Sequence, residues 1–226
     1  MIAVLTGASR GIGRACALAL AARGVDLALL GRPSSGQDDV LRLCQERGVR
    51  AQFYACDMGE VAAIERAALA LQEMGTPDVV VHNAAEHEHG PYVHEIAIDR
   101  WDRLFAVNLR GPFVLTRALL PAMLRADRGR VIFISSISGT IGCPRAAAYG
   151  ASKWGLLGLS KSLAEELRGT GLSAMAVMPG SVDTDMLAQT PFSPAITPDE
   201  VATVVTYCAL DAPKAMNGAC VEVFGP

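Results

Sequence analysis

Short, continuously apolar segments alternate along the chain with longer segments in which apolar residues recur every three or four positions. The short segments predict β-strands that are buried on both faces, as parallel strands between two layers of helices are. They lie at residues 2–6, 25–30, 50–55, 78–82, 130–135, 172–177 and 220–224. The longer segments predict helices near residues 11–23, 37–47, 60–74, 99–125, 147–168 and 198–210.

This alternation predicts an α/β fold, a doubly wound (Rossmann-type) parallel sheet of about seven strands with helices on both faces. Pro112 and Pro121 fall inside the fourth helical segment. We expect them to bend or interrupt it, because proline lacks the backbone N–H that a helix interior needs. No linker, repeat or low-complexity tract divides the chain, so residues 1–226 are expected to form a single domain.

Composition narrows the classes of function. A net charge of −3 and a pI near 5.8 give no global basic field, so we expect neither a nucleic acid nor a membrane as partner. No apolar run reaches the roughly 18 residues that indicate a membrane span. The six cysteines form no C-x-x-C pair, and most lie in apolar surroundings. They indicate reduced thiols and a cytoplasmic protein.

The stretch TGASRGIG (6–13) links the first predicted strand to the first predicted helix. Gly7 permits a tight turn, and Gly11 and Gly13 let the backbone come close to another group. Free N–H groups at a helix N-terminus bind phosphate oxygens, so the pyrophosphate of a dinucleotide is the ligand expected here. A purely structural turn would also need glycine, and the strand–turn–helix setting at the chain start favours the cofactor.

The residues after the second strand bear on the choice of dinucleotide. NAD sites usually carry an Asp or Glu at this place, whereas this chain has Gly31 and Arg32. A cation there favours the 2′-phosphate of NADP, and Arg10 in the glycine turn could contribute from the other side. The alternative is a pair of solvated arginines without a ligand.

Tyr149 and Lys153 stand four positions apart, on one face of a predicted helix. An ammonium beside a phenol favours the phenolate, so we expect Lys153 to lower the pKa of Tyr149 and to make it an acid–base group near neutral pH. Ser136 ends a predicted strand, and its hydroxyl could bind a substrate carbonyl beside the phenol. Taken singly, each of these residues could instead be purely structural.

In combination, these segments resemble the short-chain dehydrogenases/reductases of the one-domain type, and in particular the 3-oxoacyl-acyl-carrier-protein reductases. The resemblance covers essentially the whole chain. Its ordered matches are the glycine motif at Thr6–Gly13, Asp57 in CDM, Asn108 in AVNLRGPF, Ser136, Tyr149, Lys153, and the Pro-Gly segment PGSVDT at 179–184.

The resemblance implies four catalytic residues. Tyr149 would exchange a proton with the carbonyl oxygen, while Lys153 would hold the nicotinamide ribose and lower the pKa of Tyr149. Ser136 would position the carbonyl, and Asn108 would support a water that links Lys153 to solvent. Hydride would pass directly between the nicotinamide of NADP(H) and the carbonyl carbon.

The resemblance also implies the cofactor contacts, with Asp57 at the adenine. The predicted set is Gly7, Ser9, Arg10, Gly11, Ile12, Gly13, Arg32, Asp57, Met58, Asn83, Ala84, Ala85, Tyr149, Lys153, Pro179, Gly180, Val182 and Thr184. One motif departs from the family pattern, because this chain has HNAA at 82–85 where relatives usually have NNAG. Ala85 therefore adds a methyl group near the expected position of the ribose.

Two loops leave alternatives open. All four histidines lie between positions 82 and 94, in HNAAEHEHGPYVH. Imidazole and carboxylate can bind metals, but the segment lacks a defined ligand spacing, so we expect a solvated loop first, lining of the substrate entrance second, and no metal site.

Only twelve residues separate PGSVDT from TPDE. If this segment covers the substrate pocket as a lid, so short a lid suggests an open pocket.

The sequence thus predicts an NADP-dependent oxidoreductase that interconverts a ketone and a secondary alcohol, mainly in the reducing direction. A 3-oxoacyl thioester on acyl carrier protein is the first expected substrate, with small ketones, sugars or steroid-like alcohols as alternatives. A non-catalytic NADP-binding sensor or scaffold is the alternative from another class. The resemblance further implies a homotetramer through the helices at 99–125 and 147–168, with a dimer left open.

Overall fold

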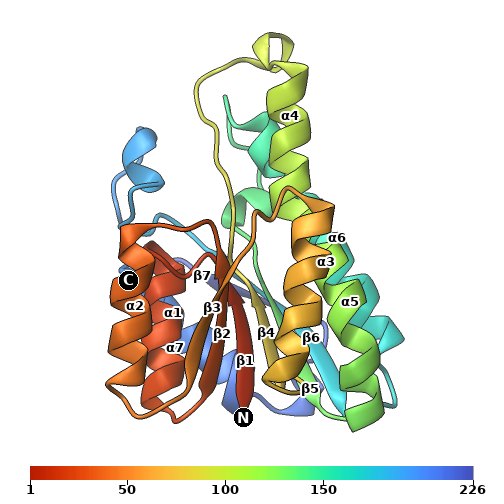
Figure 1. The fold of residues 1–226 in the computed structure, drawn as a ribbon. Coiled ribbons are helices and arrows are strands. Elements are labelled where there is room, and N and C mark those ends of the chain that lie inside the picture. Colours follow the sequence, from red (N-terminus) through yellow and green to blue (C-terminus); the bar gives the residue numbers. More distant parts are fainter. Residues whose placement is uncertain (226) are drawn as a thin grey trace.

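The computed structural model describes residues 1–225, apart from the side chain of Ser35. Its seven strands form one parallel sheet in the order β3-β2-β1-β4-β5-β6-β7 (Figure 1). The strands are β1 (Ile2–Thr6), β2 (Asp26–Gly31), β3 (Ala51–Ala55), β4 (Val79–His82), β5 (Gly129–Ile134), β6 (Leu172–Pro179) and β7 (Cys220–Val223). All seven lie within two residues of the predicted segments, and the predicted fold class is confirmed.

Helices cover both faces of the sheet (Figure 1). One layer consists of α1 (Gly11–Ala22), α2 (Ser35–Gln45) and α7 (Pro198–Thr206), with α1 in contact with both others. The opposite layer consists of α3 (Val61–Ala70), α5 (Gly111–Ala126) and α6 (Ala147–Glu166). The short helix α4 (Ile98–Phe105) projects beyond the edge of the sheet at which the strands end.

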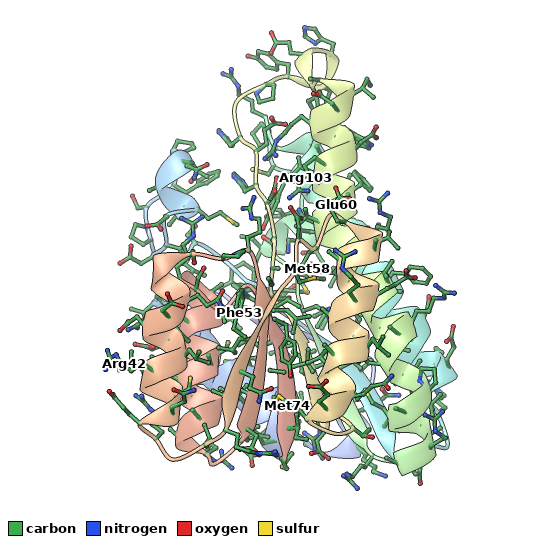
Figure 2. All side chains as sticks on the ribbon, in the orientation of Figure 1. Arg42, Phe53, Met58, Glu60, Met74 and Arg103 are labelled. Carbon is green, nitrogen blue, oxygen red and sulfur yellow. The ribbon has the colours of Figure 1, made fainter. Side chains whose placement is uncertain are left out.

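Successive side chains along a strand pack into two separate hydrophobic cores, one on each face of the sheet. In β1, Leu5 packs beneath α1, α2 and α7, whereas Val4 faces the layer of α3, α5 and α6. Of the side chains labelled in Figure 2, Phe53 packs into the first core, and Met58 and Met74 belong to the second. Since the side chains of a strand alternate between faces and both faces are buried here, every strand position can be apolar.

The predicted helix at 99–125 consists of three parts. After α4 the chain makes one wide turn over Ala106–Arg110, and α5 then begins at Gly111. A side chain at Gly111 would collide with the carbonyl group of Met58. Pro112 lies in the first turn of α5, where its missing N–H is tolerated, but Pro121 lies inside α5 without ending it. The expected interruption is therefore found before both prolines, at the wide turn.

The remaining elements are short. Single turns of tighter helix lie at Leu71–Glu73, Val93–Glu95, Ile137–Gly139, Leu187–Gln189 and Lys214–Met216, and a second wide turn, Tyr207–Asp211, follows α7. The second wide turn accounts for the end of the helix predicted at 198–210. In the part of the chain that the structure describes, no helix is long and apolar enough to cross a membrane.

His82, the last residue of β4, is buried in the second core. Its ring stacks on Phe133 at 4.8 Å between centroids, and Nε2 lies 2.8 Å from Oγ1 of Thr116. Nδ1 has no hydrogen-bond partner among the described residues. Burial lowers the pKa of His82 to about 3, because the imidazolium would lose its hydration without gaining a countercharge.

We predict that His82→Asn makes the fold less sensitive to acid. An unfolded histidine titrates near pKa ~6.5. Below that pH the unfolded chain binds a proton that folded His82 does not, so stability is lost progressively as the pH falls from about 6.5 towards 3. Between about pH 7 and pH 5, His82 should account for about 2 kcal/mol of the loss in the parent protein, and the variant should lack this contribution while keeping that of His87.

Urea unfolding at the two pH values measures the effect. The exposed His94 provides a matched control, since His94→Asn should leave the loss unchanged. If His82→Asn and the parent protein lost the same free energy of unfolding, the buried neutral imidazole would not be a source of the acid sensitivity.

Candidate active site

The segments singled out in the sequence meet at one edge of the sheet. They follow β1, β2, β3, β4, β5 and β6, and parallel strands bring their carboxyl ends to the same edge. The order of strands reverses between β1 and β4, which are neighbours in the sheet. The edge beyond such a reversal is the usual place for a ligand in this class of fold.

Hydrogen bonds fix the ends of β1 and β4 to each other at this edge. Oγ1 of Thr6 accepts from the backbone N–H groups of Asn83 and Ala84, each at 3.0 Å. The side-chain amide of Asn83 donates to the carbonyl oxygens of Thr6 (3.0 Å) and Gly7 (2.9 Å). The turn after β1 is thereby attached to the HNAA segment over a separation of more than 70 residues.

The glycine turn is shaped mainly by contacts with the chain itself. Gly7 has a φ of 72°, and a Cβ there would lie 2.8 Å from Cα of Ala84. A Cβ on Gly13 would collide with the carbonyl oxygen of Gly7, so Gly13 serves internal packing rather than an open approach. Gly11 has a φ of 53° and faces the side chain of Thr184.

The turn nevertheless fits a phosphate group. The twelve-residue helix α1 begins at Gly11, and no side chain caps the N–H groups of its first turn. These donors, together with the positive end of the helix dipole, are suited to anionic oxygens. Ile12 and Thr184 also line the large cavity described below, so the turn and the cavity adjoin.

Arg32 and Arg10 differ in their surroundings. Arg32 is exposed after β2 and lies close enough to Asp57 that its charge contributes to lowering the pKa of that carboxyl group. Arg10 forms an ion pair of 2.9 Å with Asp185, and both side chains are largely exposed. The start of α2 lies against the glycine turn, since a Cβ on Gly36 would be 2.8 Å from the carbonyl oxygen of Ser9. The Arg32 segment therefore borders the turn.

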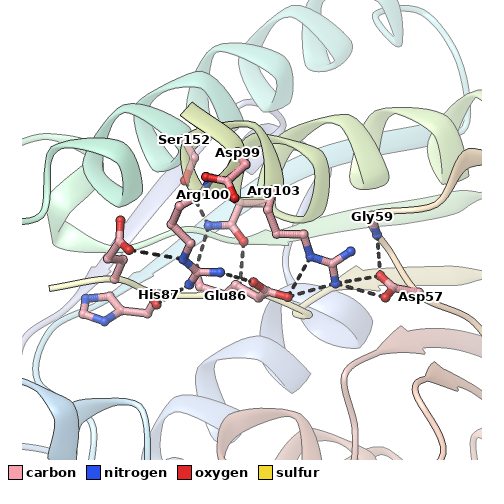
Figure 3. Close-up of polar contacts among 10 residues, drawn as sticks. Asp57, Gly59, Glu86, His87, Asp99, Arg100, Arg103 and Ser152 are labelled. Atoms are coloured by element: carbon pink, nitrogen blue, oxygen red, sulfur yellow. Dashed lines mark hydrogen bonds and ion pairs between the residues drawn. The ribbon is translucent and has the colours of Figure 1, made fainter. Parts of the chain in front are cut away.

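A chain of ion pairs runs along this edge (Figure 3). Nη2 of Arg103, in α4, lies 2.9 and 3.0 Å from the carboxylate oxygens of Asp57 and 2.9 Å from Oε1 of Glu86. Arg100 binds Oε2 of Glu86 at 2.6 Å and Glu88 at 3.3 Å. The chain thus joins the end of β3 to the segment after β4 through two arginines of α4.

The ion pairs hold two carboxylates in their charged form. Desolvation would raise the pKa of Asp57, but the hydrogen bonds from Arg103 and from the Gly59 N–H outweigh it and leave the pKa below its ordinary value. Desolvation would also raise the pKa of Glu86, but the hydrogen bonds from Arg103 and Arg100 outweigh it and leave this pKa below its ordinary value. Asp57, which the resemblance places at the adenine, is therefore already engaged by the protein.

Asn108 lies in the wide turn between α4 and α5, and its side-chain amide makes three hydrogen bonds. Oδ1 accepts from the backbone N–H of Glu86 at 2.8 Å, and Nδ2 donates to the backbone oxygen of Glu86 at 2.9 Å. Nδ2 also donates to Oγ of Ser152 in α6 at 3.0 Å. Asn108 thus ties the segment after β4 to the helix that carries Tyr149 and Lys153.

Tyr149 and Lys153 are both buried on one face of α6. Nζ of Lys153 lies 5.6 Å from the centroid of the Tyr149 ring and donates to the backbone oxygen of Ile134 at 2.8 Å. Burial raises the pKa of Tyr149 to about 12, although the Ser136 hydroxyl opposes the rise. Burial also lowers the pKa of Lys153 to about 8.

The expected depression of the Tyr149 pKa is therefore wrong for this structure. The sequence argument counted only the attraction between ammonium and phenolate. Loss of hydration acts on the phenolate more strongly than a charge several ångströms away. At neutral pH the phenol consequently keeps its proton.

Ser136 and Tyr149 share the wall of a cavity of ≈ 310 Å³. Ser136 follows β5 with an extended backbone, and its Oγ accepts from the N–H of Ser138 at 3.2 Å. Other parts of the wall come from the turn at Ile137–Gly139, from residues 141–146 and from residues 179–192. Apolar side chains in the wall include Ile12, Ile137, Ile141, Val182, Met186, Leu187 and Phe192.

One residue of the histidine segment, His87, lines this cavity, so the first expectation of a solvated loop does not hold there. His87 lines the cavity and lies edge-on against Tyr149, with 4.6 Å between ring centroids. His89 is stacked parallel to His87 at 6.5 Å and meets Phe192 of the short lid at 6.2 Å. No group of three or more His, Cys, Asp or Glu side chains in the described part of the chain is arranged for a metal ion.

Several site residues were missed by the sequence analysis. Glu86, Arg100 and Arg103 carry the ion pairs, yet the charged residues of a surface helix give no sign in sequence of which carboxylate they meet. His87 had a usable signal, because it stands only two positions after the HNAA motif that borders the site. The remaining predicted residues lie at the same edge, with Met58 buried beside Cys56 and with Val182 paired to Ile196.

Comparisons with known proteins agree with this geometry. A family model described as short chain dehydrogenase matches residues 1–192. A cis-4-hydroxycyclohexanecarboxylate dehydrogenase of Sinomonas cyclohexanicum is 34% identical over 240 residues, covering 99% of this chain and 95% of the relative. A 3-oxoacyl-acyl-carrier-protein reductase of Escherichia coli K12 is 33% identical, covering 99% and 96%.

Solved structures extend the match to three dimensions. An actinorhodin polyketide ketoreductase with NADPH has a TM-score of 0.93 at 32% identity, covering 99% of this chain and 95% of its own. A metagenomic short-chain oxidoreductase in complex with NADP has a TM-score of 0.88 at 38% identity, covering 100% and 97%. Because sequence, strand order and site segments agree nearly from end to end, the protein belongs to the short-chain dehydrogenases, a family of oxidoreductases that use NAD or NADP.

Proposed function

We propose that the protein is an NADP-dependent oxidoreductase that interconverts a ketone and a secondary alcohol, mainly as a reductase. The observation that carries this proposal is the placement of Ser136 and Tyr149 on the wall of one cavity that adjoins the glycine turn. Two hydroxyl donors at such a place can bind one carbonyl oxygen, and the phenol can deliver a proton to it. The whole chain would act as one domain.

The residues present fit NADP(H). The uncapped start of α1 and the glycine turn would hold the pyrophosphate, and the exposed guanidinium of Arg32 would pair with a 2′-phosphate. The same edge is bordered by Asn83, Ala84, Pro179, Gly180, Val182 and Thr184. Lys153 is the buried cation nearest to Tyr149. When bound, the nicotinamide supplies or accepts the hydride. Structures of relatives crystallised with NADPH or NADP support this choice.

The protonation state of the site favours reduction. A phenol whose pKa is about 12 holds its proton at neutral pH and can donate it to an oxygen that gains negative charge. Ser136 would hold that oxygen in place. Lys153, with a pKa of about 8, remains mainly cationic near neutral pH and stabilises negative charge on the phenol oxygen after the proton has left.

The substrate is proposed from the cavity and the relatives together. A 3-oxoacyl thioester, presented by acyl carrier protein, comes first, because a relative matched over nearly its whole length carries that activity in its name. The mainly apolar wall is compatible with an acyl chain. Small ketones, sugars and steroid-like alcohols are the alternatives. The free thiols of Cys16, Cys44 and Cys208, which are buried, are compatible with a proposed cytoplasmic location.

The second candidate is a non-catalytic NADP-binding sensor or scaffold. The hydrogen bonding of Asn108 favours it in one respect, because both side-chain N–H groups are used within the protein and only one acceptor position of Oδ1 remains for the water that the predicted role requires. The buried Ser136, Tyr149 and Lys153 favour the enzyme, since burying such polar groups beside an open cavity has no structural benefit.

We predict that Tyr149→Phe lowers the rate of NADPH-dependent carbonyl reduction by about 10²-fold or more, because the substitution removes the proposed proton donor. NADPH binding, followed by its fluorescence, should change little. The exposed Tyr207 supplies the control, since Tyr207→Phe should leave the rate unchanged. A Tyr149→Phe variant as active as the parent over a broad panel of ketones and acyl thioesters would refute the proposed mechanism. Binding of NADPH with no turnover by the parent would favour the sensor.

We predict that Arg32→Asp reduces kcat/KM for NADPH about 10- to 100-fold, while kcat/KM for NADH changes much less. The physical reason is the loss of a charge-assisted pair with the 2′-phosphate, which NADH lacks. Arg47→Asp, at the opposite end of α2, makes the same change in net charge and should affect neither cofactor. Equal losses with both cofactors would overturn the 2′-phosphate assignment.

We propose a homotetramer assembled through the outer face of α4, α5 and α6. Phe113 and Trp154 are about half-exposed there, and Phe113 and Leu159 line an open hollow between the helices. Gly158 of α6 faces open space, so another chain could approach this helix closely. Light scattering should give about four times the 23.7 kDa of one chain, and Phe113→Asp should lower that mass. A single-chain mass for the parent would contradict the assembly.

A further inference from the structure

The cavity beside Tyr149 contains no charged side chain among the described residues that line it. Its polar groups are the hydroxyls of serine and threonine residues, the phenol of Tyr149, the thiol of Cys143 and the imidazole of His87. A substrate that carries a free carboxylate would therefore lose water without meeting a cation. Burying an unpaired charge is far more costly than burying a neutral oxygen that receives a hydrogen bond.

The backbone at His87 is held by hydrogen bonds from two neighbouring side chains. Its backbone oxygen accepts from Nη2 of Arg100 at 2.8 Å. The residue before it, Glu86, has both backbone polar groups bound by Asn108. The imidazole itself lies edge-on against Tyr149 with an interplanar angle of 70°. The chain therefore fixes the ring beside the phenol.

The polar atoms of the His87 ring are not used by the protein. Nδ1 is buried and has no hydrogen-bond partner among the described residues. Burial lowers the pKa of His87 to about 4, and the charges of His89, Lys153 and Arg100 act in the same direction. At neutral pH the ring is uncharged, so it offers one N–H donor and one acceptor nitrogen. Because Nδ1 is enclosed by the protein, the donor that could reach a ligand is Nε2, in the tautomer that carries its proton there.

We propose that this cavity selects uncharged dicarbonyl compounds, such as 3-oxo esters and thioesters, and that His87 sets the choice by hydrogen-bonding the second carbonyl oxygen. The inference rests on the proposed function, because it names the substrate class of the same site. His87 is a specificity-determining residue in this scheme, and proton delivery stays with Tyr149.

The contact between the two rings restricts the spacing of the substrate oxygens. With 4.6 Å between the centroids of His87 and Tyr149, the two side chains are neighbours in the wall, and a ligand that binds both needs two oxygens in the same part of the molecule. A 1,3-dicarbonyl compound meets this requirement. A simple ketone lacks the second oxygen, and a 3-oxo acid carries the second oxygen as part of a carboxylate that the neutral wall cannot pair.

Three small compounds test the proposal with the parent protein and NADPH. They are ethyl 3-oxobutanoate, the free acid 3-oxobutanoate, and 2-pentanone as a ketone without a second carbonyl group. We expect kcat/KM for the ester to exceed that for the acid by at least about tenfold, since an unpaired buried charge weighs more than one hydrogen bond. The ester should also exceed 2-pentanone by about fivefold or more.

Variants of His87 separate its hydrogen bond from its bulk. His87→Phe keeps an aromatic edge against Tyr149 but removes the nitrogens, so the ratio of ester to 2-pentanone should fall towards one. His87→Gln retains a side-chain donor and should restore part of the ratio. His87→Lys adds a cation and should shift the ratio of ester to acid towards the acid. His94→Phe, at an exposed position, is the control and should change none of these ratios.

Binding supplies a readout that does not need turnover. In the Tyr149→Phe variant with NADPH, the ester should raise the melting temperature at concentrations at which the acid does not. If the ester binds in preference to the acid but the parent protein reduces none of the compounds, the proposed function is refuted and the proposed selectivity of the cavity stands. Equal binding or reduction of ester and acid, or an unchanged ratio of ester to 2-pentanone in both His87→Phe and His87→Gln, would overturn the role of His87.

Discussion

The site depends on the hydrogen bonds that the side chain of Asn108 makes with the backbone of Glu86 and with Ser152. Three segments far apart in the sequence meet in this one amide: the end of β4, the wide turn before α5, and α6. The side chain is 1% exposed, so water cannot replace a protein partner that is lost. Breaking any of its three hydrogen bonds would therefore leave a buried polar group without a partner. These bonds attach the segment that carries His87 to the helix that carries Tyr149, and both residues line the cavity. The wide turn in the helix is what allows Asn108 to reach all three partners.

A second set of contacts gives the same edge its charge pattern. Arg103 joins Asp57, after β3, to Glu86, after β4, and Arg100 continues the chain to Glu88 and to the backbone of His87 (Figure 3). The arginines of α4 are thereby engaged by carboxylates and kept out of the cavity. Two guanidinium groups and three carboxylates pair with one another outside the wall, and the described residues of the wall carry no charged side chain. One set of ion pairs thus connects the expected adenine end of the site to the substrate end.

The sequence was sufficient for whatever depends on local pattern. The seven strands could be predicted because most of them are nearly continuously apolar, and the turn after β1 because Gly7 must adopt a positive φ. The break in the helix at 99–125 could be expected, but not its cause, because a wide turn has no propensity signal and Pro121 proved compatible with a continuous helix. The sign of the Tyr149 pKa shift was beyond sequence, since it depends on complete burial. The pairing of Arg103 with Asp57, across 46 positions, was equally out of reach.

Burial favours the neutral form of both titratable side chains considered in the cavity wall, Tyr149 and His87. It raises the pKa of Tyr149 and lowers the pKa of His87, and both shifts favour the neutral form, so neither side chain is charged at physiological pH. Both side chains can then donate a hydrogen bond, and neither carries a charge that a substrate must match. A pocket of neutral donors binds carbonyl oxygens and stabilises negative charge that develops on one of them during reduction. The same neutrality that keeps a proton on Tyr149 for transfer therefore also disfavours a substrate that arrives already charged.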